Sequence, residues 1–273
     1  MPTLPREEPE SAAPQPHQTR AMAESFGVDA PGYDRARPRY SDALVNRIIA
    51  GSPGSAVLDV GCGTGIAGRQ FQAAGCTVLG VEPDARMAEF ARASGLPVEV
   101  ATFEAWAPDG RSFDAVIAAQ SWHWVDPAVG AKKAAQVLRP GGRLTIFGHV
   151  FEPPPEVAEP FAAAYRRAVP DSPFADQPAR RSVEMYEAMY AKFAEALRST
   201  GAFTEPEHWR YDWEQPYTRA EWLALLPTTG GLTRLDPGQQ ATISTAVGAA
   251  IDALGGGFMM QYSTLAVSAV RTV

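Results

Sequence analysis

Short apolar runs alternate with stretches of helical periodicity through the first part of the chain. The apolar runs have the length of buried strands and lie at 57–60, 77–81, 98–101, 113–117 and 143–146. Between them, apolar positions recur at helical spacing, which predicts helices at 42–50, 65–74, 84–94 and 128–138. Strands and helices that alternate in this way favour a parallel sheet with helices on both faces.

After residue 150 the pattern changes. Prolines break up two short helical patterns, and a longer amphipathic helix follows, with Tyr186, Phe193 and Leu197 on one stripe. Two more strands are predicted at 208–213 and 260–267, with a helical stretch between them. We therefore expect an N-terminal tail that is disordered or arm-like at 1–25, a core at 26–150, a helical cap insertion at 151–200, and C-terminal core strands at 201–273 with a further cap segment at about 218–254.

One predicted strand ends in three alternating glycines. It reads Val57-Leu58-Asp59-Val60 and leads into Gly61-Cys62-Gly63-Thr64-Gly65. Glycines at such a turn let a ligand approach the main chain, and bare amides at the following helix N-terminus favour an anionic group. We expect a cofactor at Gly61, Cys62, Gly63 and Gly65. The same stretch fits the dinucleotide fingerprint, so the glycines alone do not name the cofactor.

Two acids distinguish between the candidate cofactors. Asp59 lies two residues before the first glycine, where it would repel a pyrophosphate but attract an ammonium group. Glu82 ends the next strand, at the separation from the glycines where such folds place an acid on ribose hydroxyls. S-adenosyl-L-methionine (SAM) carries both an ammonium group and a ribose. The two acids therefore favour SAM over a nicotinamide cofactor.

Together these segments resemble motif I and the following acidic strand end of the class I SAM-dependent methyltransferases, in particular the small-molecule enzymes with a methyltransferase type 11-like domain. The resemblance continues through Phe113–Ile117, Gln120–Asp126 and the turn Pro140-Gly141-Gly142, and it covers about residues 26–150. It implies an α/β fold: a seven-stranded, mostly parallel Rossmann-like sheet with helices on both faces and an inserted helical cap. One of the last two strands is antiparallel in this family.

The resemblance also implies further cofactor contacts. Tyr33 and Arg37 resemble the N-terminal segment that lies across the cofactor, with Arg37 as a carboxylate partner, and ordinary packing of a helix onto the core is the alternative. Phe103 and Glu104 resemble the turn that contacts adenine, and a surface acid is the alternative for Glu104. The other expected cofactor contacts are Pro83, directly after Glu82, and Met87 in the helix predicted at 84–94.

Polar and aromatic residues follow the fourth predicted strand. Ligands bind at the carboxyl ends of parallel strands, so we assign Gln120 and Ser121 to the cofactor and His123 to the acceptor side as the catalytic residue. The alternative for His123 is an orienting or structural role. Methyl transfer depends mainly on holding the nucleophile, methyl and sulfur in line. A base helps with a phenol, an enol or a protonated amine, and His123 or His149 could then serve.

Composition narrows the classes of partner. The chain of 273 residues has 24 basic and 31 acidic side chains, and its formal net charge of −7 has the wrong sign for tracking a phosphate backbone. Cys62 and Cys76 can form no disulfide framework and have no metal-ligand spacing, which indicates a reducing interior and no metal. The first stretch has no apolar run, so we expect neither a signal peptide nor a membrane anchor.

These features predict an enzyme that transfers a methyl group from SAM to an apolar or aromatic small molecule in specialised metabolism, mainly by proximity and orientation. The aromatic residues of the predicted cap favour such an acceptor. We expect a cytoplasmic protein with no nucleic-acid or membrane partner, and we leave homodimer formation open. Two alternatives remain: an NAD(P)-dependent oxidoreductase with a Rossmann fold, and a non-catalytic SAM-binding protein.

Overall fold

The computed structural model describes residues 24–170, 172 and 183–272, and these contain one sheet in the order β3-β2-β1-β4-β5-β7-β6. Its strands are β1 (Ala56–Val60), β2 (Thr77–Glu82), β3 (Val98–Val100), β4 (Phe113–Ala119), β5 (Leu138–Glu152), β6 (Glu207–Thr218) and β7 (Gly257–Val270). Strands β1 to β5 are parallel, whereas β7 pairs antiparallel with both β5 and β6. The predicted fold class is confirmed.

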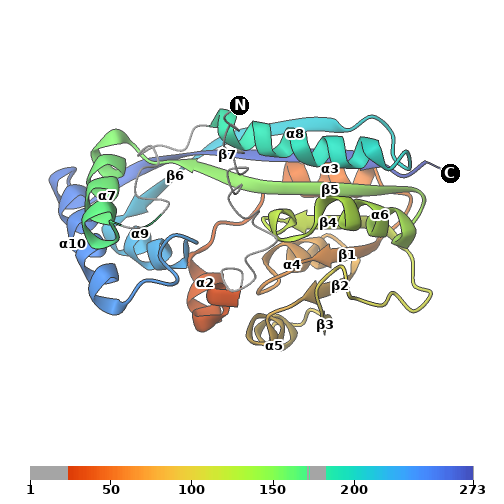
Figure 1. Ribbon diagram of the computed structural model, residues 1–273, viewed down its shortest axis with the longest axis horizontal. Helices are drawn as coiled ribbons and strands as arrows, with labels where there is room; N and C mark the ends of the chain where they lie inside the picture. The colour runs from red at the N-terminus through yellow and green to blue at the C-terminus, as the bar shows by residue number, and fades with distance from the viewer. Residues whose placement is uncertain (1–23, 171, 173–182, 273) are drawn as a thin grey trace, which may run out of the picture.

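Helices cover both faces of the sheet (Figure 1). On one face lie α3 (Asp42–Ala50), α4 (Ile66–Ala73) and α5 (Ala85–Ala93), whose buried side chains share an apolar cluster with β1 and β2. On the other face lie α6 (Pro127–Val137) and α8 (Val183–Ser199), which pack on β4, β5 and β7. None of the described helices combines the length and the apolar character needed to cross a membrane.

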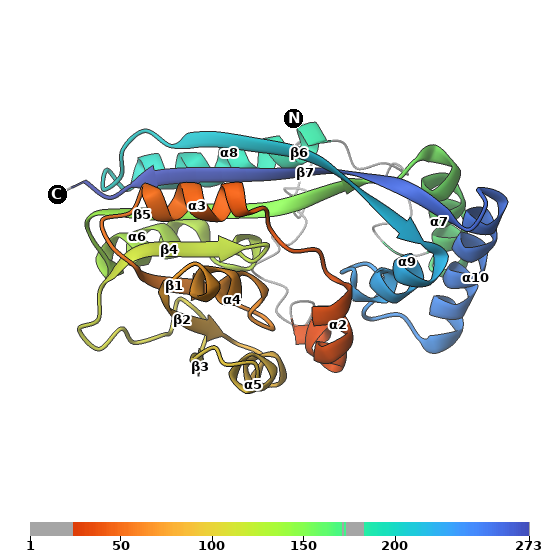
Figure 2. The ribbon, with the colours of Figure 1, turned by 180° about the vertical axis from the view of Figure 1, so that it is seen from behind.

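Strands β5, β6 and β7 continue past the end of β4 as a long ribbon that leaves the core (Figures 1 and 2). At its far end the ribbon carries α7 (Pro155–Ala168), α9 (Arg219–Leu225), the 3-10 turn η4 (Leu226–Thr228) and α10 (Pro237–Ala253). We call these four elements the cap. The cap has its own apolar cluster, in which Trp222, Ile243 and Ile251 pack with Met260 and Tyr262 of β7. The core and the cap therefore share one sheet.

The expected cap insertion at 151–200 is divided between two places. Helix α7 lies in the cap, but α8 lies along the core, where Phe193 and Leu197 share a cluster with Leu144 and Val267. The stretch at 218–254 supplies α9, η4 and α10 of the cap. The expected tail at 1–25 falls outside the described residues except for its last two positions.

A short N-terminal segment connects the core to the cap. It consists of the 3-10 helix η2 (Glu24–Asp29) and α2 (Ala30–Ala36), which lie below the ribbon in both views (Figure 2). Ser25 Oγ lies 2.6 Å from Thr233 Oγ1 of the cap, while Asp34 forms an ion pair with Arg69 of α4. The segment is therefore held at both ends.

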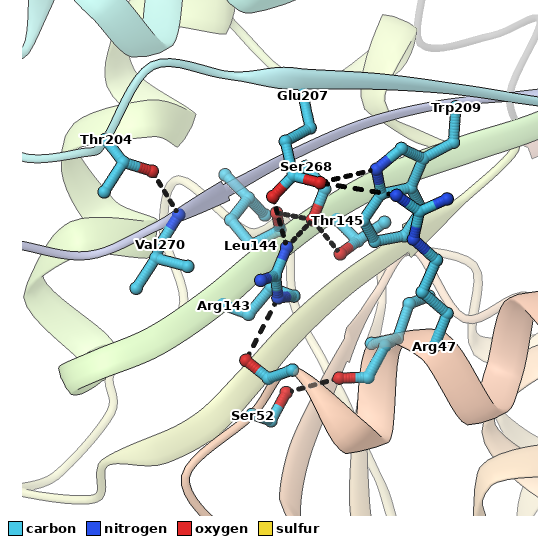
Figure 3. A network of polar contacts seen from close by, with 12 residues as sticks. Arg47, Ser52, Arg143, Leu144, Thr145, Thr204, Glu207, Trp209, Ser268 and Val270 are labelled. Atoms are coloured by element: carbon cyan, nitrogen blue, oxygen red, sulfur yellow. Dashed lines mark hydrogen bonds and ion pairs between the residues drawn. The ribbon is translucent and has the colours of Figure 1, made fainter.

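A polar network fixes α3 against the antiparallel strands (Figure 3). Glu207 of β6 accepts hydrogen bonds from Trp209 Nε1 at 3.0 Å and from Arg47 of α3 at 3.4 Å. The guanidinium groups of Arg47 and Arg143 lie 3.9 and 5.6 Å from the centroid of the Trp209 ring. Arg143 also donates to Ser268 Oγ of β7 at 2.9 Å. These contacts join the core half of the ribbon to the helix layer.

Candidate cofactor and acceptor site

The loop after β1 holds its glycines in backbone conformations that favour glycine. Gly61, Gly63 and Gly65 have φ angles of +63°, +56° and +85°. A Cβ atom on Gly61 would lie 2.6 Å from the Cβ atom of Ser121, whereas one on Gly63 would meet no described atom within 4 Å. The loop therefore packs against the residues that follow β4 at Gly61 and faces open space at Gly63.

The amides of this loop are already used within the protein. Those of Gly61, Cys62 and Gly65 donate to main-chain carbonyl oxygens at 2.8 to 3.2 Å, and that of Gly63 donates to Glu82 Oε2 at 2.8 Å. The expectation of bare amides is wrong at these four positions, because β2 runs beside the loop and takes up most of its donors. Helix α4 begins after Gly65 with no side-chain cap among the described residues, so its first turn is the remaining place for an anionic group. Cys62 is buried.

Two buried acids lie beside the loop. Glu82 accepts hydrogen bonds from the amides of Gly63 and Asp84 at 2.8 and 2.9 Å. Asp59 is fully buried, and neither of its carboxylate oxygens has a hydrogen-bond partner in the described part of the chain. Burial raises the pKa of each carboxyl to about 7. The Gly68 amide opposes part of the rise in the pKa of Asp59, but it does not form a hydrogen bond of normal geometry with the carboxylate. Since a buried carboxylate without a partner is costly, Asp59 marks a place where a cationic group would be stabilised.

The residues expected near adenine follow β2 and β3. Phe103 and Met87 are buried, and Pro83 is exposed. Glu104 accepts a hydrogen bond at Oε1 from the Asp126 amide at 2.9 Å, just before α6. This bond gives Glu104 a structural partner, and its contact with adenine stays a prediction.

Gln120 and Ser121 join the ends of three strands. Gln120 has a φ of +59°, which is uncommon for a residue other than glycine. Its side chain accepts from the main-chain N–H of His149 at 2.7 Å and donates to the His149 carbonyl at 3.1 Å. Ser121 Oγ donates to the Val60 carbonyl at the end of β1. The β4 loop is therefore fixed between β1 and β5.

His123 lies in the 3-10 turn η3 (Trp122–Trp124) after β4. It borders a cavity of about 30 Å³ whose other lining residues include Gln120 and, from α8, Tyr186 and Tyr190. The surrounding protein lowers the pKa of His123 to about 4, although part of its side chain stays exposed. The ring is therefore neutral at pH 7 and only weakly basic. Its catalytic role stays a prediction.

The N-terminal segment directs Arg37 toward the cap. Arg37 Nε donates to Thr228 Oγ1 of η4 at 3.1 Å, and its Nη2 donates to the Thr228 carbonyl. The guanidinium carbon lies 4.8 Å from the centroid of the Tyr33 ring. The polar contacts of Arg37 are thus in the cap, and its pairing with a cofactor carboxylate stays a prediction.

Two further residues lie in this region: Tyr40, to which the sequence assigns no role in the site, and His149, which the sequence indicates only as a possible base. Tyr40 is buried beneath the ribbon, with its ring stacked on that of His149 at 4.4 Å between centroids. Burial, together with Tyr33, Tyr190 and Asp59, raises the pKa of Tyr40. The sequence signal for Tyr40 was its place in the N-terminal segment, and that for His149 was its place at the end of a strand. Neither signal indicates that the two rings stack.

The glycine loop, the two acids and the β4 loop meet at the carboxyl ends of the central parallel strands. A doubly wound sheet with these features defines an α/β protein that binds a small ligand at that edge. The family profile described as a methyltransferase domain matches residues 58–146. An uncharacterized methyltransferase of Mycobacterium tuberculosis is 42% identical over 132 residues, which cover 46% of this chain and 53% of that protein. The chain thus spans about half the length of the mycobacterial relative.

Two further proteins resemble the chain. The demethylmenaquinone methyltransferase of Tropheryma whipplei is 32% identical over 165 residues, which cover 55% of this chain and 67% of that protein. The solved phosphoethanolamine N-methyltransferase 2 of Haemonchus contortus has a TM-score of 0.51 and 16% identity, and the match covers 97% of this chain and 62% of that one. That structure contains S-adenosylhomocysteine (SAH). The chain belongs to the class I SAM-dependent methyltransferases.

Proposed function

We propose that the protein transfers a methyl group from SAM to an apolar or aromatic small molecule. The observation that carries this proposal is the buried carboxylate of Asp59 next to the glycine loop, which has no hydrogen-bond partner among the described residues, with Glu82 close by. An isolated carboxylate suits the ammonium group of SAM, and Glu82 retains lone pairs for ribose hydroxyls. The phosphates of a nicotinamide cofactor would meet two acids at the same place.

Several features of the chain fit SAM. The space beside Gly63 is open, and the first turn of α4 has no side-chain cap among the described residues, as a ligand carboxylate requires. The relative from Haemonchus contortus holds SAH within the same fold, which supports the same cofactor here. In the proposal Glu82 binds the ribose, Asp59 faces the ammonium group, and Gln120 and Ser121 form the floor of the site.

SAM supplies an electrophilic methyl group attached to a sulfonium. The residues of this chain bind and orient the reactants and exclude water, which is the main requirement of an in-line displacement. The hydrogen bonds of Gln120 and Ser121 to β5 and β1 keep the floor rigid during this step. His123 is neutral because of its lowered pKa, so we propose that it positions the acceptor and accepts a proton only from an acidic group.

Aromatic side chains between the core and the cap support an apolar or aromatic acceptor. The rings of Trp213 and Tyr262 stack at 4.2 Å between centroids with an interplanar angle of 7°, and Tyr40 and His149 stack nearby. Aromatic side chains of this kind favour flat apolar molecules. We assign the reaction to specialised metabolism in the cytoplasm, with no nucleic-acid partner, in keeping with the net charge of −7.

Thermal-shift titration tests the choice of cofactor. SAM and SAH should raise the melting temperature, because a ligand at about 100 times its Kd stabilises the folded state by about 2.7 kcal/mol. NADH and NADPH should leave it unchanged. A rise with NADPH and none with SAM would assign the protein to the oxidoreductases instead.

Mass spectrometry of cell extracts incubated with the protein and labelled SAM tests the transfer itself. The proposal predicts that one compound gains one methyl group. Tight binding of SAM with no methylated product in any extract would favour the non-catalytic alternative.

A further inference from the structure

His149 lies at the point where the ribbon leaves the core, inside a group of aromatic rings. Its ring stacks on Tyr40 and meets the rings of Trp213 and Tyr262 edge-on, at 5.2 and 5.8 Å between centroids. The main chain of His149 is held by the side chain of Gln120, the first residue after β4. His149 is therefore adjacent to the carboxyl edge of the sheet, on the side that faces the cap.

A chain of polar contacts connects Trp213, Thr264 and His149 and bears on which nitrogen of His149 carries the proton. Trp213 Nε1, which can only donate, donates to Thr264 Oγ1 at 2.9 Å. Thr264 Oγ1 also lies 2.9 Å from His149 Nδ1. The Thr264 hydroxyl has its own proton to donate, and His149 Nδ1 is the remaining partner given for it. With the Thr264 proton directed to it, Nδ1 is an acceptor, and we therefore place the proton of His149 on Nε2.

The Nε2 atom has no partner in the described part of the chain, although His149 is only 9% exposed. The main-chain carbonyl of Arg39 acts to raise the pKa of the His149 ring, but it does not form a hydrogen bond of normal geometry with Nε2. Burial, with a smaller effect of Arg37, lowers the pKa of His149 to about 3, so the ring is neutral. A buried N–H donor without a partner is costly and is expected where a ligand completes the bond.

We infer that His149 donates a hydrogen bond from Nε2–H to an oxygen atom of the methyl acceptor, which is therefore a planar aromatic or conjugated molecule that carries a hydroxyl or carbonyl oxygen. This inference rests on the proposed function, since it concerns the acceptor of that reaction. The cavity that His149 lines also has aromatic side chains in Tyr186, Tyr190 and Phe193, and His149 supplies the polar contact that distinguishes an oxygenated ring from a plain hydrocarbon. Thr264 is a positioning residue, because it acts only through the tautomer of His149.

Two probes of nearly equal shape, 2-naphthol and naphthalene, test this contact in the full-length protein with SAH present. Calorimetry should show that the wild type binds 2-naphthol about tenfold more tightly. His149→Phe should remove this preference, whereas His149→Gln, which keeps an N–H donor, should retain part of it. His208→Phe, at an exposed histidine on β6, is the matched control and should leave the preference unchanged.

The tautomer provides a readout that does not depend on any variant. Nitrogen-15 NMR of the wild type should show His149 with a protonated Nε2, and Thr264→Val should redistribute the proton between the two nitrogens. A protonated Nδ1 in the wild type, a preference that survives in His149→Phe, or a wild type that binds the two probes equally or not at all would overturn the inference. SAM binding, measured separately, tests the proposed function, so the two failures are distinguishable.

Discussion

Replacement of Asp59 by asparagine should stabilise the empty protein above pH ~7 and weaken its cofactor site. Burial without a hydrogen-bond partner raises the pKa of Asp59 from 3.8 to about 7. Because folded Asp59 holds its proton more tightly than unfolded Asp59, this group's contribution to stability is fully present below about pH 4 and is lost as the pH rises toward about 7. Asparagine has no such proton, so the variant should lack this pH dependence.

The expected magnitude follows from the two pKa values. Each pH unit between them corresponds to about 1.4 kcal/mol, so ionised Asp59 destabilises the folded protein by about 4 kcal/mol above pH ~7 and by about 2 kcal/mol at pH ~5. The buried asparagine amide costs roughly 1–3 kcal/mol at either pH. The stability of Asp59→Asn relative to the wild type should therefore increase by about 2–3 kcal/mol from pH ~5 to pH ~8.

Urea unfolding without ligand, followed by circular dichroism, measures this difference at both pH values. Asp109→Asn is the control, because the Asp109 side chain is 76% exposed. The control should show no comparable change with pH. At pH ~8 the Asp59→Asn variant should also bind SAM more than tenfold more weakly, because the ammonium group loses its counter-charge. A stability of Asp59→Asn relative to the wild type that is the same at both pH values, or that falls from pH ~5 to pH ~8, would refute the reasoning about Asp59.

Four other substitutions follow from the geometry. His123→Ala should lower kcat for the acceptor while leaving the Kd for SAM unchanged, and wild-type kinetics would leave His123 a structural residue. Gly61→Ala should lower the free energy of unfolding by roughly 3 kcal/mol, through its left-handed φ and the clash with Ser121. Gly63→Ala, with no clash, should cost only about 1 kcal/mol but should weaken SAM binding; equal losses of stability would contradict this contrast. Arg37→Met should speed hydrogen exchange in η4, since it removes both bonds to Thr228, and unchanged exchange would show that they do not hold the cap.

Elements whose signals are local could be predicted from the sequence. The helix predicted at 42–50 is α3, and the Ser41 side chain caps it by accepting a hydrogen bond from the Leu44 amide at 3.3 Å. The strand predicted at 113–117 is β4, which extends two residues further. In these segments the cap, the apolar run and the adjacent turn all lie within a few residues of each other.

The lengths of the last three strands depend on pairing between distant segments. The strand predicted at 208–213 continues to Thr218, with buried Tyr217 after Pro216. A proline is tolerated there because β6 is an edge strand, and the sequence does not show which strand lies at the edge. Likewise, the apolar stripe of α8 predicts that one face is buried, but it does not show whether that face meets the core or the cap.

The site could be predicted as far as the topology fixes it. Glu82 and the glycine loop lie together because both follow neighbouring parallel strands. The hydrogen bonds that the loop amides donate depend on how the end of β2 runs beside the loop. The residue types in the sequence do not indicate this path. The contact of Tyr40 with His149 depends on how the linker before α3 passes under the ribbon, and no local pattern encodes that path.

Calorimetric titration of SAH into the wild type, Glu82→Ala and Glu89→Ala tests the central claim most directly, namely that SAM binds at the glycine loop beside Asp59 and Glu82. Glu89 is exposed on α5 and serves as the control. The account predicts one binding site in the wild type, an affinity more than tenfold lower in Glu82→Ala, and no change in Glu89→Ala. Equal affinity in all three proteins, or heat released with NADPH but not with SAH, would contradict it.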